Sequence, residues 1–321
     1  MKKFMIIHLS AIAVYIALTA PASACDFCLL SQGISPLDTS GGSGIRVSER
    51  YTLLDRAYRG RERIPNPGAR EEYWTTEFTG FFAVTDDLTL LFAVPLRKTA
   101  MDGELNVTGG TPVVDPVKGG VSGAGDAMAL GRYTFFKIHT IDTTVTAAGI
   151  FGMKFPTGKT DAKALGGTEY LDSHLQPGTG STDFLLGLSL SRAAGKFSLS
   201  ANTLGVITTA GETGDASHQF GNALNYDLTG RYRVYPGVIS SGPRVFLALG
   251  LNGELRAREE EDGIEVKDSG GHTVYITPGV QLAASSRWQA EFSYQRPVYH
   301  NLHGTQMGET GKAVAAVTYL F

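Results

Sequence analysis

Twelve stretches of the chain alternate between apolar and polar positions, and segments rich in glycine, proline and charge separate them. In one of them, Leu247, Leu249 and Leu251 fall on one face of an extended strand, and Asn252 and Glu254 fall on the other. Because side chains alternate along a strand, this period of two predicts strands with one apolar face. The predicted strands are 44–55, 71–84, 87–98, 124–137, 142–154, 181–192, 196–209, 221–235, 243–257, 271–283, 286–299 and 312–321.

The connections between these stretches differ in length. Those that follow the even-numbered strands are short, and those that follow the odd-numbered strands are mostly longer. Short periplasmic turns and longer surface loops alternate in this way in outer-membrane barrels. A basic side chain at the bilayer midplane costs about 2–4 kcal/mol, so the charged strand faces must line a lumen. We therefore predict an all-β fold, a transmembrane, antiparallel up-and-down β-barrel of about 12 strands.

The last residues and the composition agree with a barrel. Phe321 and Tyr319 share one face of the final stretch, as expected of the strand that closes a bacterial outer-membrane barrel. The 321 residues include 40 glycines and 18% charged residues, and the mean hydropathy is −0.03. A barrel needs apolar residues on one strand face only, which keeps this mean near that of a soluble protein. The net charge of −3 argues against nucleic acid as a partner.

The amino terminus has the features of a secretory signal. Lys2 and Lys3 precede an apolar run that ends in a small-residue cleavage site. After it, the chain has no uninterrupted apolar stretch of about 18 residues, the length that a membrane-spanning helix needs. We expect a cleaved signal peptide at 1–24, a periplasmic arm or plug at 25–43 and the barrel at 44–321. The expected location is the outer membrane of a Gram-negative bacterium.

The only cysteines, Cys25 and Cys28, stand at the start of the expected mature chain. Cys25 could carry a lipid because it follows a small-residue site, although Ala22 replaces the leucine that such sites usually contain. The pair could instead form a disulfide or a thiol pair in the oxidising periplasm, or bind a metal. Haem attachment is excluded because Leu29 stands where that motif requires a histidine.

The strand pattern assigns charged side chains of both signs to the barrel interior. The predicted lumen residues are Arg46, Arg50, Glu77, Asp126, Arg132, Asp183, Asp227, Arg231, Arg233, Glu254, Arg256 and Glu291. One interpretation is that they form structural ion pairs that pack a narrow barrel. The other is that they line a polar constriction through which a small solute passes. The mixture of signs favours a paired, partly filled lumen over a wide pore of a single sign.

The first predicted surface loop is basic. Arg56, Arg59, Arg61 and Arg63 lie in it, and arginine binds phosphate in a bidentate manner. We predict that these residues contact anions such as the phosphates of lipopolysaccharide; a solvated charged loop is the alternative. The acidic loop at 259–262 has the opposite charge and could pair with them across the barrel mouth.

Five histidines fall in or next to predicted surface loops. They are His174, His218, His272, His300 and His303. The last two have a spacing that occurs in metal sites, but in a loop this spacing is permissive and not specific. We interpret the loop histidines as solvated, and we assign no metal ion and no cofactor.

Two segments resemble a known family: Lys154-Phe-Pro-Thr-Gly158 at the end of one strand, and Gln176-Pro-Gly-Thr-Gly-Ser-Thr-Asp183 at the start of the next. They are similar to the outer-membrane transporter family named for the MetA pathway of phenol degradation. In that family a Pro-Thr-Gly turn, a variable loop and a Gly-Thr-Gly-Ser element follow one another, and the glycines let the backbone bend at the barrel rim. The resemblance implies passage of small compounds of hydrophobic or aromatic character.

These observations predict an outer-membrane channel or transporter for small solutes, and the family resemblance implies solutes of hydrophobic or aromatic character. The alternative is a structural barrel that docks a periplasmic redox or metal-handling protein through Cys25 and Cys28. An outer-membrane hydrolase is least favoured: serines precede His174 and His218, but no familiar catalytic signature surrounds them, so we predict no enzyme activity. The expected partners are outer-membrane lipid, lipopolysaccharide, a small-molecule solute and, under the alternative, a periplasmic protein.

Overall fold

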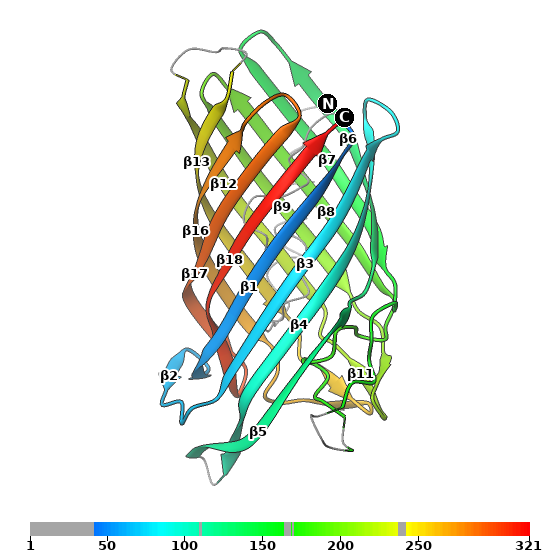
Figure 1. The fold of residues 1–321 in the computed structure, drawn as a ribbon, viewed down its shortest axis with the longest axis vertical. Coiled ribbons are helices and arrows are strands. Elements are labelled where there is room, and N and C mark those ends of the chain that lie inside the picture. Colours follow the sequence, from blue (N-terminus) through cyan, green and yellow to red (C-terminus); the bar gives the residue numbers. More distant parts are fainter. Residues whose placement is uncertain (1–41, 109–110, 164–167, 169, 237–241) are drawn as a thin grey trace, which may run out of the picture.

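Twelve antiparallel strands close into a barrel in the computed structural model, which describes residues 42–108, 111–163, 168, 170–236 and 242–321 (Figure 1). The last strand pairs with the first, with Gly44 opposite Leu320. The barrel strands are β1 (Gly44–Arg59), β3 (Arg70–Ala83), β4 (Leu88–Thr108), β6 (Met128–His139), β7 (Thr143–Lys154), β8 (Asp183–Ala194), β9 (Phe197–Ile207), β12 (Ala223–Tyr235), β13 (Arg244–Arg256), β16 (Gly271–Ala283), β17 (Trp288–Leu302) and β18 (Thr305–Leu320). The predicted up-and-down barrel of 12 strands is confirmed.

The barrel strands turn apolar side chains outward and mostly polar side chains inward. In β13, Leu247, Leu249 and Leu251 are 47–57% exposed on the outer surface, whereas Asn252 and Glu254 are 1–3% exposed inside. An exposed apolar band is stable only against lipid, because water would make its exposure unfavourable. The alternation read from the sequence therefore describes the two faces of the barrel wall.

The short turns and both ends of the barrel sequence lie at one end of the barrel, at the top of Figure 1, and the long connections lie at the other. Trp288 and Tyr319 pack against each other at the turn end, with tilted rings whose centroids are 4.8 Å apart. Aromatic side chains at strand ends are typical of the membrane interface. In outer-membrane barrels, short turns of this kind are periplasmic. Within the described ranges, no helix is long and apolar enough to cross a membrane.

The third predicted strand is longer than its pattern indicates. It was expected to end at residue 98, but β4 continues to Thr108 and pairs there with β5 (Thr111–Ala124). This hairpin extends past the barrel wall (Figure 1). The fourth barrel strand consequently begins at Met128, because residue 124 belongs to β5. Prolines and glycines in β5 make the sequence resemble a loop, while backbone hydrogen bonds to β4 make it a strand.

The last surface connection is shorter than predicted. Its sequence from residue 300 to 311 resembles a loop, but β17 and β18 extend into it and leave only His303 and Gly304 between them. Gly304 has a φ of +61°, a left-handed value that favours glycine and allows a tight turn. The outer part of β18 is held by β1, which pairs Arg59 with Thr305. The alternation of short and long connections therefore fails at this last pair of strands.

Short strands occupy three more of the long connections. β2 (Glu62–Ile64) folds back onto β1. A separate four-stranded sheet consists of β10 (Gly211–Thr213), β11 (Ala216–Gln219), β14 (Glu260–Glu261) and β15 (Ile264–Glu265). Because β11 pairs with β14, this sheet joins the connection between β9 and β12 to the connection between β13 and β16. Two of the surface connections are thus joined by backbone pairing.

Candidate functional site

The inner wall of the barrel carries the charged residues that the alternation assigns to the lumen. Those with buried side chains are Arg46, Arg50, Glu77, Asp126, Arg132, Asp183, Asp227, Arg231, Arg233, Glu254 and Arg256. Glu291 reaches the same interior, where it forms an ion pair with Arg46. Asp126 and Asp183 lie toward the loop end, just before β6 and at the start of β8.

Ion pairs connect part of this charged wall. Arg256 Nη2 lies 2.9 Å from Glu254 Oε1, and Lys312 Nζ lies 3.7 Å from Glu254 Oε2. Lys312 is also 3.4 Å from Glu309 and 4.8 Å from the centre of the Tyr275 ring. Such contacts between buried charges favour the interpretation of a packed, narrow lumen over a wide pore of a single sign.

An apolar stripe crosses the lumen wall on six neighbouring barrel strands, from β3 to β9. Its members are Phe81, Leu91, Ala93, Met128, Leu130, Ile150, Leu185 and Leu204, which pack into one buried cluster. This stripe is absent from the predicted lumen residues, because only charged side chains were assigned to inward positions. The available signal is the run Leu88–Val94, which is apolar at nearly every position and therefore on both strand faces.

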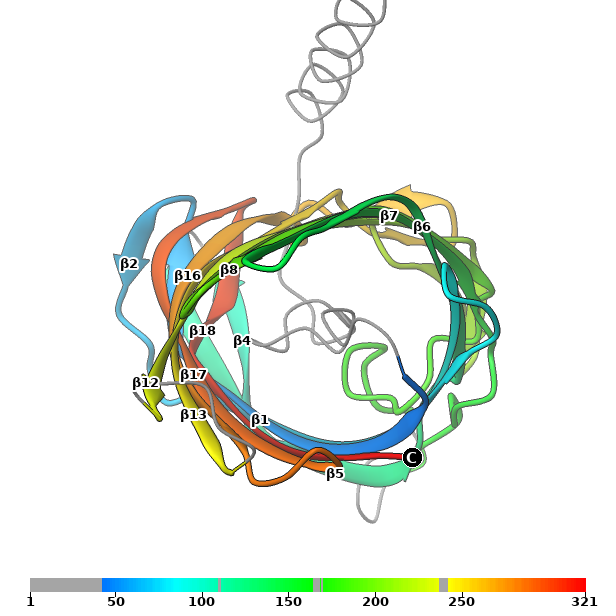
Figure 2. The same cartoon turned by 90° about the horizontal axis from the view of Figure 1, so that it is seen from above.

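The connection between β7 and β8 folds into the barrel (Figure 2). Inward side chains of β4 hold it: Arg97 Nη1 donates to the carbonyl oxygens of Gln176 at 3.2 Å and Pro177 at 3.3 Å. The Thr99 hydroxyl donates to the carbonyl oxygen of Leu175 at 2.8 Å. These bonds satisfy loop carbonyls that burial removes from water, so the segment is stable against the inner wall.

Asp126 fastens the base of this inward loop. One of its carboxylate oxygens accepts the Gly158 backbone N–H at 2.9 Å, and the other accepts the Thr179 N–H at 2.8 Å and hydroxyl at 2.7 Å. Lys154 Nζ lies 3.4 Å from the same carboxylate and 2.6 Å from that of Asp183. Charge-assisted hydrogen bonds are the stronger ones. The two segments with the family resemblance therefore meet at one buried carboxylate.

Glycine is required where these two segments touch. A Cβ atom on Gly158 would lie 2.6 Å from the Cα atom of Gly178, and one on Gly178 would lie 2.7 Å from the Cα atom of Gly158. Any side chain at either position would push the two backbones apart. Close approach of two backbone segments, in addition to the bend expected from the sequence, thus accounts for both glycines.

A cavity of 470 Å³ opens between the inward loop and the barrel wall. His174 and Leu175 line it from the loop, and Tyr73, Arg97 and Glu309 line it from the wall. Cavities of about 300–1,000 Å³ hold small-molecule ligands. The loop end of the lumen therefore has room for a small solute beside the inward loop.

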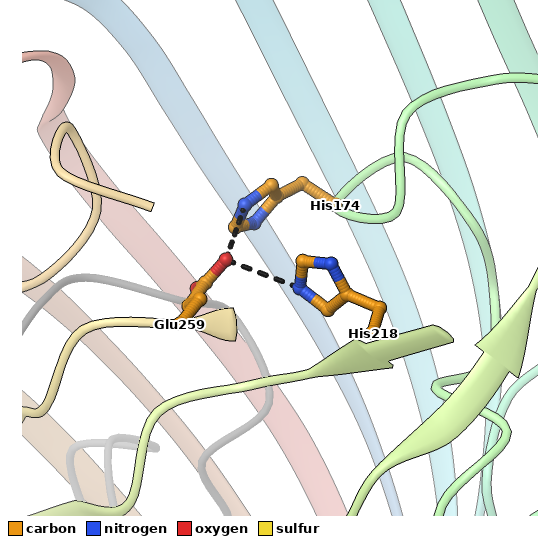
Figure 3. Close-up of side chains that lie close together, drawn as sticks. All are labelled: His174, His218 and Glu259. Carbon is orange, nitrogen blue, oxygen red and sulfur yellow. Dashed lines mark hydrogen bonds and ion pairs between the residues drawn. The ribbon is translucent and has the colours of Figure 1, made fainter. Parts of the chain in front are cut away.

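At the same end of the barrel, His174, His218 and Glu259 meet from three surface connections (Figure 3). Glu259 Oε2 lies 2.9 Å from His174 Nε2 and 3.2 Å from His218 Nε2. Burial alone would raise the pKa of the Glu259 carboxyl, but the facing imidazoles hold that pKa well below its ordinary value. Our interpretation of the loop histidines as solvated is wrong for His218, which is buried.

His300 and His303, the pair with a metal-like spacing in the sequence, contact different groups and do not share a site. His300 Nδ1 lies 3.2 Å from Thr273 Oγ1 on β16, whereas His303 Nδ1 lies 3.2 Å from the carbonyl oxygen of Ser269. His300 is buried, so it too departs from the solvated interpretation. The histidine cluster instead joins residues from separate connections, and no local spacing in the sequence indicates it.

The basic residues of the first connection belong mostly to strands. Arg56 and Arg59 are in β1, Arg63 is in β2, and Arg61 lies in the turn between them. The predicted loop is therefore partly a hairpin, on which Arg59, Arg61 and Arg63 are exposed. In the acidic connection, Glu259 faces the two histidines, so it is not the partner expected for these arginines.

A solved structure shares this architecture. An outer-membrane channel from Pseudomonas putida F1 matches with 16% identity and a TM-score of 0.67, over 90% of this chain and 100% of that one. Two other structures are less similar. The transport unit of the autotransporter AIDA-I from Escherichia coli matches with 9% identity and a TM-score of 0.45, over 90% of this chain and 93% of that one. The β domain of the Bordetella autotransporter Brka matches with 10% identity and a TM-score of 0.43, over 88% of this chain and 100% of that one. No curated protein matches. The family described as "Putative MetA-pathway of phenol degradation" matches residues 68–301, and this outer-membrane β-barrel belongs to that family.

Proposed function

We propose that the barrel is a channel through which small solutes with an apolar or aromatic body cross the outer membrane. The observation that carries this proposal is the apolar stripe on the lumen wall, which runs from Phe81 on β3 to Leu204 on β9. A lumen for purely hydrophilic solutes gains nothing from such a stripe, whereas apolar contact lowers the free energy of an apolar solute. The family description, which names phenol degradation, supports a small aromatic solute.

We propose that a solute approaches this stripe through the cavity beside the inward loop. Loop residues 175–177 lie against β4, where Arg97 and Thr99 hold them. The cavity opens on the loop side of Arg97, between polar and apolar side chains. A solute that enters from this side first meets a mixed surface and then the apolar stripe. The loop would thus set how often the channel is open, and the stripe would set which solute is favoured.

The test is flux through the refolded protein. In planar bilayers we expect steady single-channel conductance, and in proteoliposomes we expect benzoate to pass faster than acetate. Leu204→Asn should reduce the benzoate preference about fivefold, because losing roughly 1 kcal/mol of apolar contact has that effect. Thr229→Asn, which changes an inward side chain outside the stripe, should leave the preference unchanged. Silent bilayers from a barrel shown to be folded, or equal effects of both variants, would contradict the proposal.

We also propose that residues 25–43 act as a periplasmic arm or a lumen plug, between a cleaved signal peptide and the barrel. Cys25 and Cys28 lie outside the described residues, and their lipidation, pairing or use in docking a periplasmic protein stays a prediction. Deletion of 25–43 separates the two placements. A plug predicts higher conductance after deletion, whereas a docking arm predicts the same conductance and loss of partner binding.

For the outer surface, we propose that the exposed arginines of the first connection contact lipopolysaccharide phosphates. Arg59, Arg61 and Arg63 project from a hairpin beyond the barrel wall, where anionic head groups would be in reach. Replacing the three by glutamine should weaken binding of the folded protein to lipopolysaccharide. The control is Arg192→Gln, an exposed position toward the turn end of β8. Unchanged binding of the triple variant would remove this proposal.

A further inference from the structure

His174, His218 and Glu259 form a cluster with the geometry of a cation site. We propose that these three side chains bind one divalent transition-metal ion, and that the ion ties three surface connections together over the lumen. One ligand atom from each residue can be chosen such that all three lie within 4.8 Å of one another. Two of the separations are shorter still, at 2.9 Å and 3.2 Å from Glu259 Oε2 to the histidine Nε2 atoms.

These distances suit a tetrahedral ion. Zn²⁺ binds histidine nitrogen and carboxylate oxygen at about 2.0–2.2 Å, so two of its ligand atoms lie about 3.3 Å apart. The oxygen–nitrogen separations at Glu259 are close to that value, and small rotations of His174 and His218 bring their nitrogens together. Imidazole suits Zn²⁺, Cu²⁺ and Ni²⁺, whereas Mg²⁺ and Ca²⁺ prefer sites made of oxygen alone. The donor set therefore selects a transition-metal ion.

Burial gives an independent indication of a ligand. Glu259 is 1% exposed, and its Oε1 atom has no hydrogen-bond partner among the residues that the structure describes. A buried polar atom without a partner costs about 1–3 kcal/mol. The two histidines already contact the other carboxylate oxygen, Oε2. An ion bound to both carboxylate oxygens would give Oε1 a partner and so remove that cost. With a cation bound, both carboxylate oxygens of Glu259 would thus have a partner, whereas the three side chains alone leave Oε1 without one.

Neighbouring groups hold the ligands in place. The Glu259 backbone N–H donates to Ser269 Oγ at 2.9 Å, and His218 lies in β11, which pairs with β14. The Phe220 ring contacts both imidazoles edge-on, with centroids 5.6 Å from His174 and 4.5 Å from His218. Groups around the ligands that fix their orientation are a regular part of metal sites. Only His174, whose side chain is 38% exposed, leaves an open approach for the ion.

The ion would connect parts of the chain that are far apart in sequence. His174 belongs to the inward loop after β7, His218 to the connection after β9, and Glu259 to the connection after β13. His174 also lines the cavity of 470 Å³ at the loop end of the lumen. A bound ion would therefore hold the inward loop to the small outer sheet, next to the path of the proposed solute.

The test is Zn²⁺ binding to the folded chain from residue 25, with Cys25→Ser and Cys28→Ser to remove the thiols. After treatment with a chelator, calorimetric titration should show one ion per barrel. His174→Gln and Glu259→Gln should each weaken binding by more than about tenfold, because even the loss of a group that only orients a ligand weakens metal binding about 10–100-fold. His139→Gln, at the exposed turn end of β6, should bind as the parent does.

Two further measurements distinguish loss of metal binding from a folding defect. His174→Gln changes a partly exposed loop side chain, so its barrel should retain the heat-dependent migration of a folded barrel in detergent gels. Co²⁺ in place of Zn²⁺ should give the visible absorption of a tetrahedral nitrogen and oxygen site, and this signal should be lost in the variant. Absence of Zn²⁺ binding by the parent, or parental affinity in both variants, would overturn the metal site without affecting the proposed channel.

Discussion

Replacement of Asp126 tests whether the connection between β7 and β8 is latched inside the lumen. Its buried carboxylate accepts three hydrogen bonds of 2.7–2.9 Å from Gly158 and Thr179 and lies 3.4 Å from Lys154. Asp126 precedes β6 and is not part of a barrel strand. We predict that Asp126→Ala releases the loop, while the hydrogen-bonded strands keep the barrel closed.

The magnitude follows from the contacts that remain. Removing one partner of a buried ion pair costs about 3–5 kcal/mol. Lys154 keeps its second carboxylate, Asp183, at 2.6 Å, so the lower end of that range applies. A shift of about 3 kcal/mol changes the ratio of released to latched loop by a factor of about 100. The mean conductance should rise with the released fraction if the loop narrows the lumen.

Limited proteolysis measures the released fraction directly. Lys159 is an exposed trypsin site within the loop. When loop opening is fast relative to cleavage, the cleavage rate follows the open population, so Asp126→Ala should be cut there about 100 times faster. Asp161→Ala is the matched control, because this exposed carboxylate is 3.9 Å from Lys159 and such surface pairs contribute about 0–1 kcal/mol. Equal cleavage rates in the two variants, with both barrels folded, would refute the latch.

Two other substitutions test the packing described above. Gly158→Ala should destabilise the bound position of the same loop by about 1–3 kcal/mol, the usual cost of overpacking, and so speed its proteolysis. Gly149→Ala is the control: its added Cβ atom would meet no atom within 4 Å, so the rate of proteolysis should not change. Leu249→Arg, on the outer face near the middle of β13, should destabilise the barrel by about 2–4 kcal/mol in urea unfolding from lipid vesicles. Val234→Arg, next to the end of β12, should cost about 0–1 kcal/mol; equal costs at the two depths would contradict the assigned lipid face.

The barrel could be predicted because each of its strands faces lipid on one side and a polar interior on the other. Lipid outside and a polar interior impose a period of two, as in β13, and that period is visible without a partner strand. The outer β4–β5 hairpin lies past the barrel wall, so lipid does not constrain it, and its prolines and glycines hide the strand. The tight turn at His303 and Gly304 was missed for the same reason.

The candidate site was only partly predictable. Charged inward positions follow from the alternation, but the grouping of His174, His218 and Glu259 does not, since they come from three connections with no common spacing. Their approach depends on the pairing of β11 with β14 and on the inward course of the loop after β7. Long-range contacts of this kind leave no periodic signal in a single sequence.

The segments that carry the family resemblance act at the base of the inward loop. Gly158 and Thr179 bind Asp126 largely through backbone N–H groups, and Gly158 and Gly178 touch through bare backbone. A latch made in this way places few demands on the side chains between the two segments, so the loop tip can vary while its base keeps the same position. The apolar stripe, by contrast, lies on the inward faces of the barrel strands. Changes at the base should therefore alter how often the channel is open, and changes in the stripe should alter which solute passes.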